Sequence, residues 1–125
     1  LLDAMAARRE AGARPAELRR RIENAIQAEA GTAHVEELSD PYLLFFWNSN
    51  VRSTALALGS KVRSSAPLAE VSGLVRWLVQ ARRNGRWGNT QENALAIRAL
   101  VDYYRRYESV TPDFTAVVSL GTREI

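Results

Sequence analysis

A short internal repeat constrains the fold of this chain more than any other feature of its sequence. Residues 50–58, NVRSTALAL, match residues 89–97, NTQENALAI, position by position. Each copy begins with an asparagine, a residue that caps helices well, and continues through one polar turn into Ala-Leu-Ala-aliphatic. A helix that is apolar on almost every side is buried on every side. The repeat therefore predicts two equivalent helices that other helices enclose.

Segments of this buried type alternate with amphipathic segments along the chain. The amphipathic ones repeat apolar residues with the helical period on one face and carry Arg and Glu on the other. We expect buried helices over residues 1–11, 51–64 and 90–107, and amphipathic helices over residues 15–30 and 67–83. This alternation fits two concentric layers, with inner helices covered all round and outer helices in contact with water. The predicted fold class is mostly α, a partial α/α-toroid, and a stack of helical hairpins is the competing arrangement.

Cap and turn residues indicate where these helices begin and end. Gly31 is expected to end the second helix. In the loop 85–88, Gly-Arg-Trp-Gly, the two glycines permit positive φ on either side of a ring that turns inward. Asn89 is predicted to cap the helix that follows, and the Glu92 side chain to accept a hydrogen bond from the N–H of Asn89 itself. Gly59, within an apolar stretch, predicts close packing against a neighbouring element.

Two stretches depart from the helical pattern. Residues 32–36 and 42–47 are rich in β-branched and aromatic residues and are separated by Leu-Ser-Asp-Pro, a turn sequence. We expect a small β-hairpin, or two short extended segments, over residues 32–47. Residues 114–120 alternate like a strand that has no obvious partner in the chain. The domain prediction is a helical domain over residues 1–110 and the start of a β-sandwich over residues 111–125.

Charge and composition exclude several classes of site. The net charge is +3, with sixteen Arg and one Lys, but acidic residues are interspersed among the basic ones, which is typical of solvated helix faces, so no nucleic-acid partner is expected. The absence of Cys excludes disulfides, thiolate zinc sites and a Cys nucleophile within this chain. No apolar run approaches the roughly 18 residues that span a bilayer. The chain begins Leu-Leu-Asp, in helical character, and we interpret it as a piece of a longer protein.

The stretch around the second repeat copy resembles a known family. Residues 73–94, GLVRWLVQARRNGRWGNTQENA, resemble the last helical repeat of the thioester domain of bacterial α2-macroglobulins. Residues 46–55, FWNSNVRSTA, resemble the preceding repeat of the same domain. The likeness extends over roughly residues 1–108, and residues 112–117, PDFTAV, are similar to the start of the macroglobulin β-sandwich that follows. Squalene and hopene cyclases and prenyltransferase β-subunits carry related Gly-x-Trp repeats on the same toroid.

The resemblance implies a bacterial protease inhibitor of broad specificity in the periplasm or cell envelope. Such a protein traps a protease that has cut its bait segment, and in many members a Cys–Gln thioester then captures a lysine. The implied partners are target proteases, through the full-length parent, and the adjoining macroglobulin domains. The thioester motif, Cys-Xaa-Glu-Gln, is absent here and in the family lies upstream of the matching region, so whether the parent has one stays open.

The expected role of this chain is non-catalytic, as a wall that shields or carries the thioester. One alternative is a fragment of an α/α-toroid enzyme of the terpene cyclase or carbohydrate-active type. Such enzymes need clustered acids at the mouth of the toroid, whereas Glu92 is the only acid at the starts of the predicted inner helices. The other alternative is a helical-repeat interaction module. An incomplete ring would also expose apolar helix edges, so self-association is possible.

Several polar and aromatic residues could form a site, and for each we favour a structural role. His34 could act as a general base, but no nucleophile is visible near it in sequence. The spacing of Glu36, Glu37 and Asp40 matches no Ca²⁺ loop. Residues 43–47 could be an edge that binds a partner, although burial within the domain fits their composition better.

We also favour a structural role for the polar turn of the second repeat copy and for the tryptophans. The polar turn Gln91, Glu92 and Asn93 could carry catalysis at a toroid mouth, but capping and loop hydrogen bonds account for it. The tryptophans could line an aromatic pocket, but we expect core anchors between inner and outer helices. These are Trp47, Trp77 and Trp87. Arg98 and Asp102, one helical turn apart, are predicted to form an ion pair. No catalytic, cofactor-binding or metal-binding residue is predicted, and no cofactor is expected.

Overall fold

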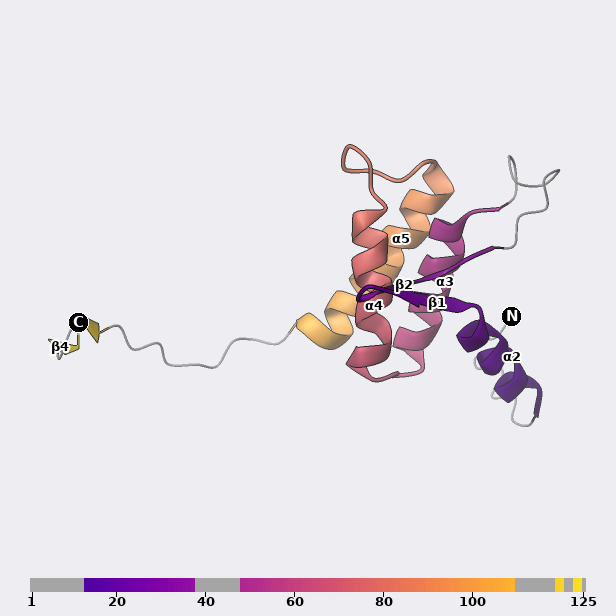
Figure 1. The fold of residues 1–125 in the computed structure, drawn as a ribbon, viewed down its shortest axis with the longest axis horizontal. Helices are drawn as coiled ribbons and strands as arrows, with labels where there is room; N and C mark the ends of the chain where they lie inside the picture. The colour runs from indigo at the N-terminus through magenta and orange to yellow at the C-terminus, as the bar shows by residue number, and fades with distance from the viewer. Residues whose placement is uncertain (1–12, 38–47, 110–118, 121–122, 125) are drawn as a thin grey trace.

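The computed structural model describes residues 13–37, 48–109, 119–120 and 123–124. This part of the chain is mostly helical, as the sequence predicts, and it also contains a small antiparallel hairpin (Figure 1). The main elements are α2 (Ala13–Asn24), β1 (Ile26–Glu29), β2 (Thr32–Val35), α3 (Asn50–Arg63), α4 (Leu68–Gln80) and α5 (Thr90–Tyr103). The helices predicted over residues 51–64, 67–83 and 90–107 are therefore confirmed to within a few residues, whereas the helix predicted over residues 1–11 lies outside the described residues.

The last helix of the bundle changes its geometry before it ends. After α5, residues Tyr104–Glu108 form a π-helical turn, labelled η1, in which the N–H of Ser109 donates to the carbonyl of Tyr104 at 2.9 Å. The Tyr107 hydroxyl then donates to the carbonyl of Ala66, at the α3–α4 connection, at 2.5 Å. The π-helical turn is thus joined, through the Tyr107 side chain, to the connection between α3 and α4.

The hairpin is not the one that the sequence predicts. Residues 15–30 were expected to be one helix, but α2 ends at Asn24 and residues 26–29 form β1, which pairs antiparallel with β2. Gly31 does not end a helix, because it lies in the hairpin turn. Both turn residues have positive φ, Ala30 at 44° and Gly31 at 83°. Two such residues in succession match the right-handed twist of a two-residue hairpin.

Residues 32–35 are extended, as predicted, and the partner that the structure shows for them is β1. Residues 42–47 lie outside the described residues. Of the strand predicted over residues 114–120, the described part is β3 (Ser119–Leu120), and it does have a partner in this chain. It pairs antiparallel with β4 (Arg123–Glu124).

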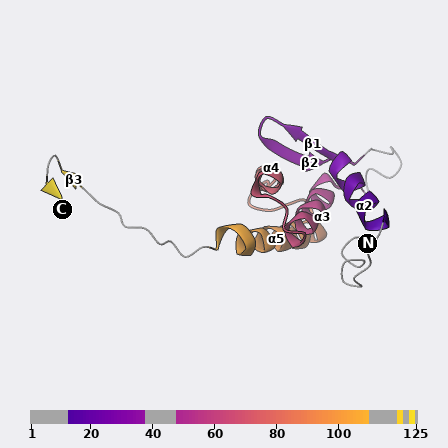
Figure 2. The same ribbon diagram turned by 90° about the horizontal axis from the view of Figure 1, so that it is seen from below.

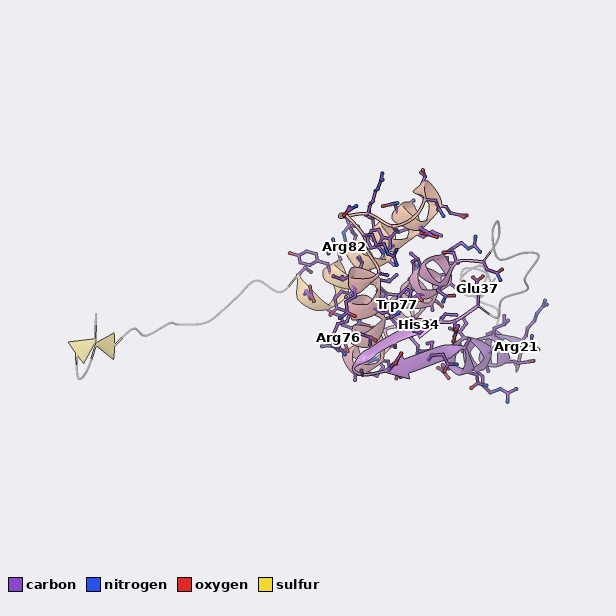
Figure 3. The ribbon with its side chains drawn as sticks, turned by 45° about the horizontal axis from the view of Figure 1, so that its top comes forward. Arg21, His34, Glu37, Arg76, Trp77 and Arg82 are labelled. Carbon is purple, nitrogen blue, oxygen red and sulfur yellow. The ribbon has the colours of Figure 1, made fainter. Side chains whose placement is uncertain are left out.

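The hairpin lies against α4, and a glycine permits its close approach. A Cβ placed on Gly73 would lie 3.1 Å from the Cβ and 3.2 Å from the backbone nitrogen of Ala33 in β2. Beside this contact, the rings of His34 and Trp77 stack with centroids 4.8 Å apart and planes at 8° (Figure 3). Arg76 Nε donates to the carbonyl of Gly31 at 2.6 Å. These contacts with α4 are made by β2 and the hairpin turn, and residues 26–29 join them through their pairing with β2.

The helices form two layers (Figure 2). α3 and α5 lie side by side, while α4 and the hairpin lie over α3 on its other side. The core lies among α3, α4 and α5 and includes side chains with no exposed surface: Thr54, Leu58, Val71, Leu74, Leu78 and Ala96. No helix among the described residues is long and apolar enough to cross a membrane.

The expectation that α3 and α5 are enclosed on every side is not met within the described part of the chain. Leu56 of α3 is 50% exposed, and Ile97 of α5 is 53% exposed. Val101, one turn beyond Ile97, is also exposed. Within the described part of the chain, both helices therefore present apolar side chains to solvent.

Candidate functional site

The two helices of the repeat run parallel and in register. Near their N-termini, Arg52 Nη1 donates to Gln91 Oε1 at 3.4 Å, and near their C-termini Arg63 Nη1 lies 3.7 Å from Asp102 Oδ2. Each pair joins residues that are 39 positions apart, which is the spacing of the repeat. Equivalent residues of the two copies therefore lie side by side along the whole contact. The result is that two positive helix ends meet at one end of the bundle.

A cluster of polar side chains occupies this paired end, and we refer to it as the cap cluster: Glu37, Ser49, Asn50, Arg52, Ser53, Gln91, Glu92 and Asn93. Two caps begin the helices. Ser49 Oγ accepts from the N–H of Arg52 at 3.1 Å, and Asn89 Oδ1 accepts from the N–H of Glu92 at 2.9 Å. The predicted cap at Asn89 is confirmed. In the first copy Ser49 is the cap, and Asn50 instead accepts from the N–H of Glu37 at 3.0 Å.

The Glu92 carboxylate links the two caps. Its Oε1 accepts from Ser49 Oγ at 2.7 Å, and its Oε2 accepts from the N–H of Gly88 at 2.8 Å. The predicted reach to the N–H of Asn89 is therefore wrong by one residue. The positive φ values of this loop lie at Asn84 and Gly85, whereas Gly88, which was expected to share this property, does not have a positive φ.

Glu37, which precedes the first copy in the chain, completes the cluster from the other side. Its Oε2 accepts from the N–H of Ser49 at 3.1 Å. Its Oε1 accepts from the hydroxyl of Ser53 and lies 3.7 Å from Arg52 Nη2. A carboxylate therefore lies at the first turn of each helix, where the helix dipole favours negative charge.

One repeat position fixes the segment that leads into each helix. Thr54, which is fully buried, accepts from the N–H of Val35 in β2 at 2.9 Å. Its counterpart Asn93 accepts from the N–H of Trp87 at 3.2 Å and donates to the carbonyl of Trp87 at 3.0 Å. In both copies a polar side chain within the helix satisfies the backbone of the incoming chain. The Asn93 bonds are the loop hydrogen bonding expected for the polar turn of Gln91, Glu92 and Asn93. The Thr54 bond is of the same kind, and the sequence did not single out Thr54.

The cluster holds its acids and hydroxyls in hydrogen bonds to one another. A serine nucleophile needs a neighbouring base that is free to take its proton. Here the carboxylates that accept from Ser49 and Ser53 also accept from the backbone N–H groups of Gly88 and Ser49, so both are already engaged as hydrogen-bond acceptors in the caps. His34 lies elsewhere, stacked on Trp77. The arrangement is suited to joining two helices rather than to acyl transfer.

The acidic residues considered for a cation separate in the structure. Glu37 faces the cap cluster, and Glu36 is exposed. Asp40 lies outside the described residues, as do residues 43–47, which were considered as a partner edge. Within the described ranges, no three His, Cys, Asp or Glu side chains gather as metal ligands would.

Trp87 is a core anchor, as expected. It is 6% exposed, and its Nε1 donates to the carbonyl of Leu78, near the end of α4, at 3.0 Å. The Arg82 guanidinium carbon lies 5.9 Å from the centre of its ring. Trp77 is half-buried and packs against the core from α4. Trp47 lies outside the described residues.

Two local expectations about α3 and α5 are corrected by the contact between these helices. Asp102 pairs with Arg63 of α3, so the ion pair predicted with Arg98 is replaced by one between the helices. A Cβ on Gly59 would meet the guanidinium of Arg63 at 3.1 Å, so the group that approaches this glycine is a side chain of its own helix. Gly59 and Arg63 line a groove of about 250 Å³ between α3 and α5.

Sequence reasoning missed Ser49, Ser53 and Thr54 as members of a polar network. For Ser53 and Thr54 the repeat contained the signal, since their counterparts Glu92 and Asn93 are also polar and parallel helices bring equivalent positions together. Ser49 precedes the first copy, and its counterpart is Gly88. Comparisons with protein-family models, with curated proteins and with solved structures found no match to this chain. The likeness of residues 46–55 and 73–94 to macroglobulin repeats therefore stays a prediction based on those residues.

Proposed function

We propose that this chain forms part of the α/α-toroid of a bacterial α2-macroglobulin-like protease trap in the periplasm or cell envelope. The observation that carries the proposal is the parallel, in-register contact of α3 and α5 at the 39-residue spacing of the repeat. In a toroid, consecutive inner helices run parallel, with an outer helix returning the chain between them. The position of α4, between α3 and α5 in sequence and over α3 in space, agrees with that path (Figure 2).

The uncovered apolar side chains support further helices on both sides of this pair. Leu56 on α3 and Ile97 and Val101 on α5 are the exposed apolar residues of the proposed inner layer. In a ring, the preceding and following inner helices would cover them. In the isolated chain the same faces favour self-association, and light scattering at increasing concentration tests this. A strictly monomeric profile at high concentration would contradict it.

The closed hydrogen bonding of the cap cluster supports a non-catalytic role. A toroid enzyme of the cyclase type needs acids at the mouth that can release protons or bind metal ions. Glu37 and Glu92 instead hold helix caps and backbone N–H groups. The proposed role is a rigid wall that shields or carries a thioester supplied by residues upstream.

The decisive experiment uses the full-length parent protein and a panel of proteases. After incubation, a trapped protease should still cleave a small peptide substrate, should lose activity toward a large protein substrate, and should migrate with the parent in native gels. Undiminished cleavage of the protein substrate by every protease, with no complex, would overturn the proposal. A Cys-Xaa-Glu-Gln motif in the parent upstream of residue 1 would strengthen it, and an Asp-rich motif there would favour a toroid enzyme.

The isolated 125-residue chain should not inhibit proteases, because it contains neither a bait segment nor a thioester motif. Residual protease activity in the presence of excess chain measures this directly. Inhibition by the chain alone would contradict the assignment of trapping to the whole parent.

A further inference from the structure

The connection between α4 and α5 contains a tight hairpin turn that the proposed function does not use. The N–H of Arg83 donates to the carbonyl of Arg86 at 2.9 Å, and the N–H of Arg86 donates back to the carbonyl of Arg83 at 3.2 Å. Between them Asn84 and Gly85 have φ of 52° and 78°. Two successive residues of positive φ, Asn then Gly, make the preferred two-residue hairpin turn. This connection extends beyond the end of α4 (Figure 1).

The turn places two arginines directly opposite one another. Residues that exchange both backbone hydrogen bonds across an antiparallel pair carry their side chains on the same face. Like charges in that position repel each other and destabilise the pair. The turn would avoid this repulsion with almost any other residue pair, so the positive charge concentrated at Arg83 and Arg86 is a cost to the isolated fold.

No acid of the connection offsets that charge. Residues 80–91, QARRNGRWGNTQ, contain three arginines and no acid. The next residue, Glu92, has its two carboxylate oxygens bonded to Ser49 and Gly88. Arg82 is held separately, since its Nε donates to the carbonyl of Val79 at 3.2 Å and its guanidinium lies over Trp87. Arg82 therefore interacts with the negative end of α4, which leaves Arg83 and Arg86 as the charges directed to solvent.

A hollow adjoins the two arginines. It measures about 500 Å³ and is lined by Ala81, Arg83, Asn84, Arg86, Trp87 and Gly88. We propose that Arg83 and Arg86 bind a phosphate-type oxyanion in this hollow. A guanidinium presents paired N–H donors that match the oxygens of a phosphate group, and charge-assisted bonds of this kind are among the stronger ones. An anion between the two groups would also remove their mutual repulsion. The inference is independent of the macroglobulin proposal.

Inorganic phosphate is the first probe, titrated into the 125-residue chain at constant ionic strength while backbone amide NMR shifts are followed. The shifts of residues 83–86 should saturate. The variant Arg83→Gln/Arg86→Gln keeps the backbone hydrogen bonds of the turn and should bind phosphate about tenfold or more weakly. The matched control Arg19→Gln/Arg20→Gln removes the same charge from the exposed face of α2 and should bind like the unaltered chain. Circular dichroism checks that both variants fold.

Vesicles distinguish the two sources of a phosphate group. Co-sedimentation is measured with phosphatidylcholine vesicles that contain about 30% phosphatidylglycerol, a composition chosen for its anionic surface. Saturation by phosphate without vesicle binding identifies a soluble phosphate compound as the ligand. Vesicle binding that only Arg83→Gln/Arg86→Gln abolishes identifies a lipid headgroup. The proposal is overturned if neither probe affects residues 83–86, or if both double variants lose binding equally, because the effect is then one of net charge.

Discussion

The Ser49 hydroxyl donates a 2.7 Å hydrogen bond to Glu92, 43 positions later in the chain, and so joins the first turns of two helices. The same carboxylate accepts from the N–H of Gly88, and Ser49 also caps its own helix. The Glu92 side chain, in the first turn of α5, is thereby hydrogen-bonded both to the start of α3 and to the loop between α4 and α5. The repeat produces two similar helices, and the bond from Ser49 to Glu92 holds their N-terminal turns next to each other.

Glu92→Ala should lower the free energy of unfolding by about 1–3 kcal/mol, because two donors lose a charged acceptor and the first turn of α5 loses its negative charge. The matched control is Glu17→Ala, which removes an acid from an exposed pair with Arg21 on α2. That change should cost no more than about 0.5 kcal/mol. Urea unfolding measures both. Equal losses in the two variants would show that the link between the caps contributes nothing specific.

Thr54→Val should be strongly destabilising although the two side chains have nearly the same shape. Thr54 is fully buried, and its hydroxyl is the acceptor for the N–H of Val35. Valine leaves that part-buried N–H without its partner, which costs about 1–3 kcal/mol. Thr90→Val, at the exposed start of α5, makes the same chemical change without this bond and should have a small effect. Thermal unfolding of both variants distinguishes the cases, and a neutral Thr54→Val would refute the role assigned to the hydroxyl.

Gly73→Ala should leave the chain less stable than Gly59→Ala, although both glycines lie inside helices, both changes improve helix propensity, and both would gain a contact of 3.1 Å. At Gly73 the contact is with the Ala33 side chain and backbone, so the hairpin must move, and such overpacking costs about 1–3 kcal/mol. At Gly59 the contact is with the flexible end of Arg63, while alanine improves helix propensity by about 1 kcal/mol. Chemical denaturation should give Gly59→Ala a higher free energy of unfolding than Gly73→Ala. The reverse order would mean that the hairpin does not depend on this close approach.

Tyr103 should make stability depend on pH in the alkaline range. Burial raises the pKa of Tyr103, and the neighbouring Glu108 carboxylate raises it further. Because the folded state holds the phenolic proton more tightly than the unfolded state, this contribution is complete below the ordinary tyrosine pKa of about 10 and is lost as pH rises through the folded-state pKa. The stability advantage of the unaltered chain over Tyr103→Phe should therefore shrink as pH rises above about 10.

The control for this pH effect is Tyr104→Phe, since Tyr104 is 55% exposed. Unfolding free energies at a series of pH values, on both sides of the ordinary pKa, measure the two differences. The Tyr104→Phe variant gives the reference for the loss of an exposed tyrosine hydroxyl. An advantage over Tyr103→Phe that does not change with pH would contradict the assignment.

The features that could be predicted from the sequence are those that neighbouring residues decide. The helices over residues 51–64, 67–83 and 90–107 were found because their apolar period is regular, and Asn89 was found as a cap because its acceptor reaches an N–H three residues away. Residues 26–29 were misassigned because the sequence Ile-Gln-Ala-Glu suits a helix as well as a strand. Their conformation depends on β2 and, through it, on the contact with Gly73 of α4.

The polar contacts also divide into those that neighbouring residues decide and those that tertiary packing decides. The local partner available to Asp102 is Arg98, yet the structure pairs it with Arg63 on a different helix. Nothing within one helical turn of Ser49 indicates its bond to Glu92. By itself the sequence determined the repeat, the helix starts and the segments that must bury apolar surface, because these follow from periodicity and capping. The tertiary structure decided the hairpin, its close approach to α4 and the cap cluster, because these depend on which distant backbones lie within hydrogen-bonding distance after the helices have packed.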